Sequence, residues 1–218
     1  MRNRKLRWPA GGKLGYTGKQ STIVAEMSPI MINMSLATLY MLSLPPVLIT
    51  AAIARRVFRT SWRALWVRSL FVLYLLSVLK FTLLPMPMPS LAEDLRAIVP
   101  DAVLRVNYRP LWLGEHFVFL DIEQVLNILL FVPFGVLFGL LARGRTGITL
   151  LGGLIASAAI ETLQLILCLV IGFPYRVIDV NDLIYNFAGA CIGLGLLKIG
   201  SFAASKLTGH ESRPWWSG

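Results

Sequence analysis

Residues 147–171 read GITLLGGLIASAAIETLQLILCLVI, a run in which Glu161 is the only charged residue. An α-helix needs about 20 mostly apolar residues to cross a hydrocarbon core of roughly 30 Å. The run is long enough to do so, and its composition leaves little polar surface for water. We therefore predict a membrane-spanning helix here, and this helix decides the class of fold.

Similar apolar runs occur elsewhere in the chain. Of the 218 residues, 56% are hydrophobic and only 15% are charged, whereas soluble domains carry about 25% charged residues. The mean hydropathy is +0.68. These values exclude a soluble globular domain and predict an all-α polytopic membrane helical bundle of about five transmembrane helices. The predicted spans are 30–54, 64–84, 122–142, 147–171 and 183–200.

Four segments are expected along the chain: a basic tail at 1–29 that we predict to be disordered, an additional transmembrane segment with a cytoplasmic loop at 30–63, the main membrane domain at 64–200 and a C-terminal tail at 201–218. Pro45-Pro46 interrupts the first apolar run, because proline kinks or breaks a helix. This run is therefore either a bent span or a re-entrant hairpin, and the two alternatives place the tail on opposite sides of the membrane.

The net charge of +10 reflects membrane topology rather than nucleic-acid binding, because the basic residues lie in short segments between apolar runs. Nine of them fall on one side of the predicted spans and four on the other, so the first side should be cytoplasmic. The nine are Arg55, Arg56, Arg59, Arg63, Arg143, Arg145, Lys198, Lys206 and Arg213; the four are Arg96, Arg105, Arg109 and Arg176.

Neither cysteine nor histidine forms a metal-binding pattern. Cys168 and Cys191 both lie inside apolar runs, and His116 and His210 belong to no ligand motif. We predict no metal and no cofactor.

Polar residues in and beside the last three spans are the candidate ligand-binding site. Glu161 and Gln164 are spaced i, i+3 and so share a helical face. At a rise of about 1.5 Å per residue, Gln164 should lie roughly 10 Å and Glu161 roughly 15 Å below the outer boundary. We predict an outward-facing polar cleft with Glu161 at its floor. A buried polar clamp that fixes helix packing is the alternative. The site residues are Asn127, Glu161, Gln164, Arg176, Asp179, Asp182 and Asn186.

Two further features carry structural expectations. Gly189, Gly193 and Gly195 should permit close contact between helices. The long loop 85–121 should be either functional or disordered, and its Met86-Pro87-Met88-Pro89 stretch should stop a helix.

The order of the motifs resembles the VanZ-like family of bacterial membrane proteins, from about Leu70 to Leu197. The resemblance rests on Tyr74 through Thr82-Leu83-Leu84-Pro85, Asn127-x-Leu-Leu-Phe131-x-Pro133-Phe134-Gly135, Glu161-Thr-Leu-Gln164, Arg176-x-x-Asp179-x-x-Asp182 and Asn186-x-x-Gly189-Ala190-x-x-Gly193. It implies a multi-pass protein of the bacterial cell membrane, linked to resistance to glycopeptide antibiotics of the teicoplanin type. The family's Asn-x-x-Pro-Phe-like loop motif is matched only loosely at Asn107, so we assign that residue no role.

Three functions remain open. The first is a binding protein whose cleft holds the head group of an envelope lipid, a lipid-linked cell-wall precursor or a lipoglycopeptide. The second is an enzyme that modifies a lipid or cell-wall precursor with carboxylates as acid, base or metal ligands. The third is a transporter subunit, which the absence of evident inverted repeats disfavours. We expect membrane lipids as partners and no nucleic acid, and we rank binding before catalysis.

Overall fold

The computed structural model describes residues 31–98, 106–108 and 122–208. The expectation of a disordered tail at 1–29 lies outside them. Five of the helices within this part of the chain are long and apolar enough to cross a membrane, which confirms the all-α polytopic fold. The helices are α2 (Leu36–Phe58), α3 (Trp62–Leu83), α4 (Pro89–Ile98), α5 (Ile122–Leu141), α6 (Thr146–Ile171) and α7 (Val180–Thr208).

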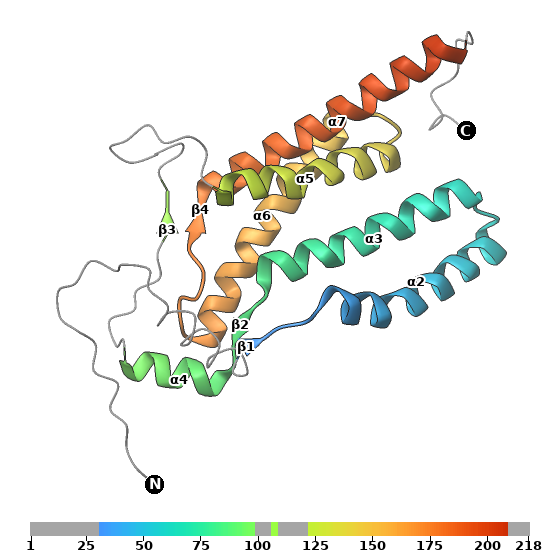
Figure 1. Ribbon diagram of the computed structural model, residues 1–218. Coiled ribbons are helices and arrows are strands. Elements are labelled where there is room, and N and C mark those ends of the chain that lie inside the picture. Colours follow the sequence, from blue (N-terminus) through green and yellow to red (C-terminus); the bar gives the residue numbers. More distant parts are fainter. Residues whose placement is uncertain (1–30, 99–105, 109–121, 209–218) are drawn as a thin grey trace.

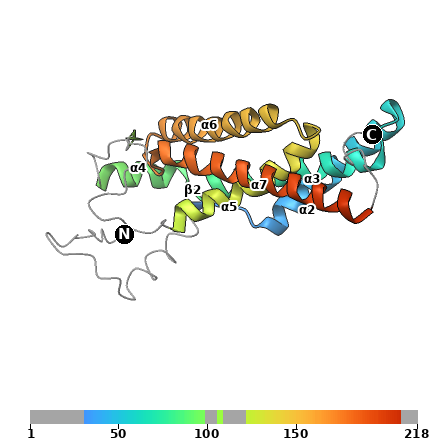
Figure 2. The same ribbon diagram turned by 90° about the horizontal axis from the view of Figure 1, so that it is seen from above.

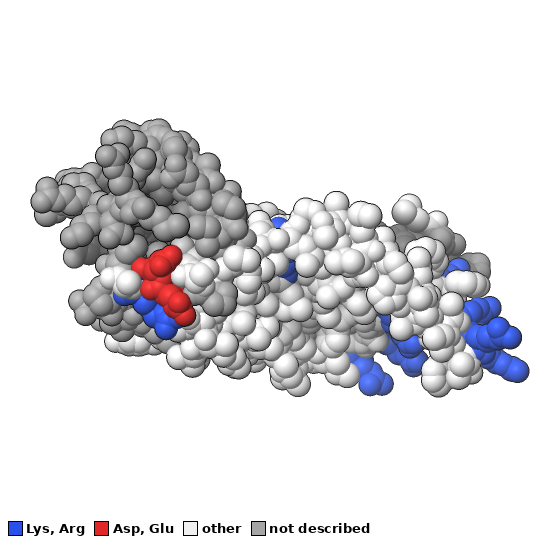
Figure 3. All heavy atoms as spheres, turned by 90° about the horizontal axis from the view of Figure 1, so that it is seen from below, with Lys and Arg blue, Asp and Glu red and all other residues white. Residues whose placement is uncertain are grey.

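The long helices run along one common direction, so the bundle has two distinct ends (Figures 1 and 2). The α2–α3 and α5–α6 turns lie at one end, together with the C-terminal part of α7. We call this the basic end, because most of the Lys and Arg side chains in Figure 3 gather there. The opposite end carries α4, the short strands and the visible Asp and Glu side chains (Figures 1 and 3). We call it the cavity end.

Two pairs of very short strands join segments at the cavity end. β1 (Met31–Ile32) pairs antiparallel with β2 (Met86–Pro87), so the segment before α2 is tied to the segment after α3. β3 (Val106–Asn107) pairs in parallel with β4 (Ile178–Asp179), which brings the loop before α5 against the start of α7.

The first apolar run forms one continuous helix, α2, with Pro45 and Pro46 inside it. Ser35 caps its start by accepting a 3.0 Å hydrogen bond from the backbone N–H of Thr38, which satisfies one of the free donors of the first turn. α2 packs beside α3 (Figure 1). The single helix from Leu36 to Phe58 is long and apolar enough to cross a membrane, so it favours the span over the re-entrant hairpin.

The last helix differs most from its predicted range. α7 covers Val180–Thr208, not 183–200. Asp179 explains the earlier start: its side chain accepts a 2.8 Å hydrogen bond from the backbone N–H of Asn181, as an N-cap does. Asp182 therefore lies in the first turn of α7, where a carboxylate is favoured by the helix dipole. At the other end the helix continues into the predicted C-terminal tail as far as Thr208.

The closest helix packing is between α5 and α7, and it depends on glycine. A Cβ atom added at Gly189 would collide with the carbonyl oxygen of Ile128, and one at Gly193 with that of Val132. The prediction of close contact is confirmed for these two residues. It is wrong for Gly195, where an added Cβ would meet no atom within 4 Å.

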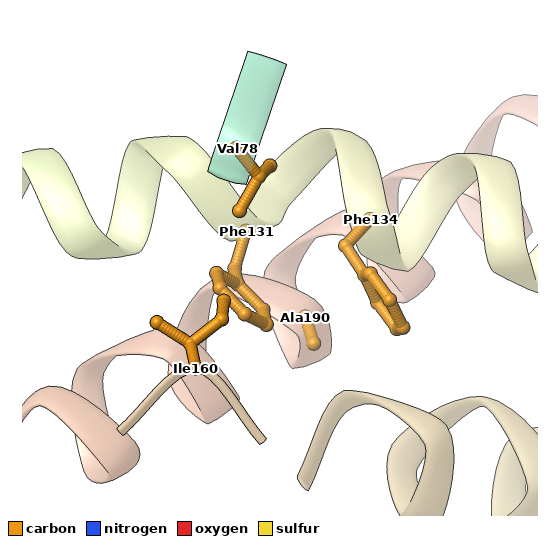
Figure 4. Close-up of a cluster of buried hydrophobic side chains, with 5 residues drawn as sticks. All are labelled: Val78, Phe131, Phe134, Ile160 and Ala190. Carbon is orange, nitrogen blue, oxygen red and sulfur yellow. The ribbon is translucent and has the colours of Figure 1, made fainter. Parts of the chain in front are cut away.

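Four helices meet at a small apolar core. Figure 4 shows the side chain of Phe131 between those of Val78, Ile160 and Ala190, with Phe134 beside them. These residues come from α3, α5, α6 and α7, and all are buried. The core therefore fixes the relative positions of the helices that surround the polar residues at the cavity end.

The loop 85–121 contains a helix that the sequence analysis did not predict. α4 begins at Pro89, because proline is well suited to the first position of a helix, where its missing N–H is not needed. Leu91 and Ala92 are buried on the inner face of α4. Arg96 lies close to Gly172, the left-handed residue that ends α6, so α4 covers the end of that helix.

Candidate functional site: a polar cavity at one end of the bundle

A cavity of about 800 Å³ opens at the cavity end, between α3, α5, α6 and the segment that leads into α7. This volume is in the range of ligand-binding pockets, about 300–1,000 Å³. We call it the polar cavity. Its walls are formed by Phe81, Thr82, Glu123, Leu126, Asn127, Leu129, Leu130, Gln164, Tyr175, Arg176, Val177, Asp179 and Asp182.

One wall joins α5 to the first turn of α7. Asn127 Nδ2 donates a 2.6 Å hydrogen bond to Asp182 Oδ1. Hydrogen bonds to a charged acceptor are short and about twice as strong as neutral ones. The contact therefore holds the carboxylate in place in the cavity wall.

Asp179 lies at the centre of a second set of contacts. Asn107 Nδ2 donates to both of its carboxylate oxygens, at 3.0 and 3.1 Å. The backbone N–H of Asp179 donates in turn to Glu161 Oε2, at 3.3 Å. Asn107, to which we assigned no role from the sequence, therefore positions a cavity residue. Pairing of β3 with β4 brings these two residues side by side.

Gln164 and Arg176 fasten the end of α3 to the other helices through backbone carbonyls. Gln164 Nε2 donates to the carbonyl oxygen of Thr82 at 2.9 Å, and Arg176 Nη2 donates to that of Leu84 at 3.3 Å. These carbonyls lie at or beyond the last turn of α3, where no further helical N–H is available to them.

Within the part of the chain that the structure describes, three buried polar atoms of cavity-lining residues have no hydrogen-bond partner: Gln164 Oε1, Tyr175 Oη and Arg176 Nε. Gln164 is only 7% exposed. Buried polar groups in proteins are nearly always paired, so such a cluster needs an explanation. Burial, with a smaller effect of nearby Cys168, raises the pKa of the Tyr175 hydroxyl, which keeps this group protonated and able to donate. The three atoms are an acceptor, a hydroxyl and a cationic donor, each enclosed within the protein.

The sequence was compared with protein families, curated proteins and solved structures. A family model described as VanZ/LLP1 matches residues 71–201, more than half of the chain. The chain belongs to the VanZ/LLP1 family. No curated protein and no solved structure matches it. The resemblance predicted from Leu70 to Leu197 is thus confirmed. The VanZ/LLP1 region contains every residue of the polar cavity walls, whereas α2 lies wholly outside it.

Within the VanZ/LLP1 region the structure brings together most of the predicted site. Asn127, Gln164, Arg176, Asp179 and Asp182 line the polar cavity. Glu161 and Asn186 do not. Glu161, which was expected at the floor, is not a lining residue, and its Oε2 accepts from the backbone N–H of Asp179. Asn186 is 3% exposed and donates to Ser157 Oγ at 2.9 Å between α6 and α7, which is the packing role proposed as the alternative.

Sequence reasoning missed several cavity residues of this VanZ/LLP1 member. Tyr175 precedes Arg176 directly, and its amphipathic ring beside a charged residue was an available signal. Thr82 lies near the end of α3 and Glu123 near the start of α5. That they line the cavity depends on how these helices pack against the others, which the sequence does not reveal. Among the residues that the structure describes, no group of three His, Cys, Asp or Glu side chains could hold a metal ion.

Proposed function

We propose that this VanZ-like membrane protein binds the polar head group of an envelope lipid, or of a lipid-linked ligand such as a lipoglycopeptide, in the polar cavity. The observation that carries the proposal is the composition of the cavity walls, which combine carboxylates, amides and one guanidinium at the end of a membrane bundle. Ligand pockets are typically apolar spaces with a few convergent polar groups that orient the ligand. A head group with complementary donors and acceptors would find such groups here.

The charges of the cavity walls suggest the chemistry of the ligand. Glu123, Asp179 and Asp182 provide three carboxylates, against one guanidinium from Arg176. Carboxylates form strong charge-assisted bonds with ammonium groups and also accept from sugar hydroxyls, while arginine suits phosphate or carboxylate. An amine-bearing head group, or an amino sugar with an anionic neighbour, matches this combination.

The position of the cavity supports access from the membrane. Phe81, Leu126 and Leu129 in its wall are exposed apolar residues, so the cavity borders the hydrocarbon region as well as the aqueous side. With the basic end in the cytoplasm, as the distribution of Lys and Arg favours, the cavity faces the outer leaflet of a bacterial cell membrane. Lipid-anchored antibiotics of the teicoplanin type act at that surface, which accords with the family resemblance.

The test uses the full chain in a teicoplanin-sensitive bacterium. Asp182→Asn keeps the shape of the side chain but removes its charge, and Gln164→Leu removes an unpartnered acceptor. We expect both variants to lose any resistance that the wild-type chain confers, with equal amounts of protein in the membrane. The matched control is Asp94→Asn, an exposed carboxylate on α4 that does not line the cavity. Wild-type resistance in both cavity variants would refute the proposal.

Reconstitution separates binding from catalysis. The purified chain is placed in vesicles of phosphatidylethanolamine and phosphatidylglycerol. It is then extracted with detergent and isolated again, and the lipids that remain bound are identified by mass spectrometry. Preferential retention of the amine-bearing lipid, weakened by Asp182→Asn, supports a head-group site. Chemical conversion of either lipid would instead favour an enzyme that uses the same carboxylates.

A further inference from the structure

A second cavity adjoins the first and has the opposite character. It measures about 450 Å³ and lies between α2, α3 and α5. We call it the apolar groove. Its walls are Tyr40, Leu44, Leu70, Leu73, Tyr74, Ser77, Val78, Phe81, Leu129, Leu130 and Pro133. Three of these residues, Phe81, Leu129 and Leu130, also line the polar cavity, so the two spaces adjoin at these side chains.

The few polar side chains of the apolar groove are satisfied within the protein. The Tyr40 hydroxyl and Ser77 Oγ are hydrogen-bonded to each other at 2.8 Å. The Tyr74 hydroxyl donates to the carbonyl oxygen of Leu130 at 2.7 Å. A ligand in the groove therefore meets paired polar groups and aliphatic or aromatic carbon. This contrasts with the polar cavity, whose walls carry three carboxylates and one guanidinium.

The length of the groove matches one leaflet of a bilayer. Leu70 and Phe81 are eleven positions apart on α3, which corresponds to roughly 16 Å at the rise of an α-helix. Half of a hydrocarbon core is about 15 Å. The groove begins beside the polar cavity and runs toward the basic end, which is the direction taken by the chain of a lipid whose head group lies in the cavity.

We infer that the apolar groove holds one acyl chain of the same ligand whose head group occupies the polar cavity. This inference rests on the proposed function and narrows it to an amphiphile, that is, a head group carrying a hydrocarbon chain. Because lipid is as apolar as the groove, the chain gains little from burial. Its contribution is to orient the ligand and to select for chains that pack against α2 and α3.

The inference is tested with a photoreactive lipid. Full-length protein is placed in phosphatidylcholine vesicles that contain phosphatidylethanolamine with a diazirine in one acyl chain, and labelled residues are mapped by mass spectrometry. We expect labels to concentrate on groove residues such as Leu73 and Pro133, at about tenfold the level on Leu151 and Ile155, which are exposed positions on α6. Phosphatidylglycerol with the same diazirine chain shows whether the amine is required.

A groove-filling variant makes the test specific. Leu44→Trp places a bulky ring in the wall on α2, and Leu42→Trp, on the same helix but outside the groove, is its matched control. We expect Leu44→Trp to reduce groove labelling to the level of Leu151, and Leu42→Trp to leave it unchanged. Melting temperatures of both variants near the wild-type value show that they are folded.

The possible results separate the two proposals. If Asp182→Asn abolishes retention of phosphatidylethanolamine while groove residues of the wild type are labelled no more than Leu151, the head-group site stands and the acyl groove is refuted. If groove residues are labelled strongly but equally in wild type and Asp182→Asn, with no preference between the two lipids, the groove binds chains independently and the proposed function fails. Labelling that depends on both Leu44 and Asp182 supports both.

Discussion

Asn127 on α5 and Asp182 on α7 are joined by a 2.6 Å hydrogen bond in the wall of the polar cavity. The bond combines two roles, because it ties two membrane helices together and holds a carboxylate in that wall. It also links two motifs of the chain that are separated by the whole of α6.

Replacing Asn127 should show how much this hydrogen bond contributes to the stability of the protein. Removing a partner from a hydrogen bond to a charged group costs about 1.5–3 kcal/mol, so we expect Asn127→Ala to lower the melting temperature in detergent and to weaken lipid retention. A double-mutant cycle with Asp182→Ala measures the coupling. Strictly additive effects of the two substitutions would show that the bond contributes nothing.

The α5–α7 contact should be sensitive to the smallest possible increase in side-chain size. Gly189→Ala and Gly193→Ala each place a methyl group against a backbone carbonyl of α5, and overpacking of this kind costs about 1–3 kcal/mol. We expect clear losses of thermal stability. Gly195→Ala is the matched control, because its added methyl group meets no atom within 4 Å. Equal melting temperatures for all three variants would contradict the close packing.

Asn107 should hold the loop segment of β3 against the start of α7. Asn107→Ala removes both donations to Asp179. We expect faster amide hydrogen exchange at residues 106–108 and 178–179, with little change in α6. Unchanged exchange at both strands would mean that the backbone pairing alone keeps them together.

Cysteine labelling tests which polar residues face the aqueous side. In a Cys168→Ala, Cys191→Ala background, single cysteines at 127 and 179 should react with a membrane-impermeant reagent added outside intact cells. A cysteine at 186 should not, because Asn186 is buried against Ser157. Arg63→Cys at the basic end serves as the control for inward-facing positions. Reaction at 63 but not at 127 would reverse the assigned orientation.

Hydropathy predicted the spans well because a membrane helix must be apolar over its whole length, and the starts of α3, α5 and α6 fall within two residues of expectation. The same reasoning failed where polar residues belong to a helix. Asn181 and Asp182 lie in the first turn of α7, although both are polar. Pro89 was expected only to stop a helix, whereas it is the first residue of α4.

The candidate site was predicted in composition but not in its pairing. The depths estimated from the helix rise predicted that Asn127, Gln164 and Asp182 lie near one another, and all three line the polar cavity. Their partners could not be found in this way, because Thr82 and Leu84 contribute backbone carbonyls, which every residue possesses. The place of Glu161 was misjudged for a related reason: its acceptor oxygen is satisfied by the backbone of Asp179, a contact that only the path of the chain before α7 creates.

The two adjoining spaces share residues of α3 and α5, but only the apolar groove also uses α2. Every wall of the polar cavity lies within residues 71–201, whereas Tyr40 and Leu44 of the groove belong to α2, outside the family match. Under the proposed binding mode, substitutions in α2 would reshape the hydrocarbon side of the site and leave the walls of the polar cavity unchanged. Exchange of α2 between homologues should then alter the preference for the acyl chain without altering the preference for the head group.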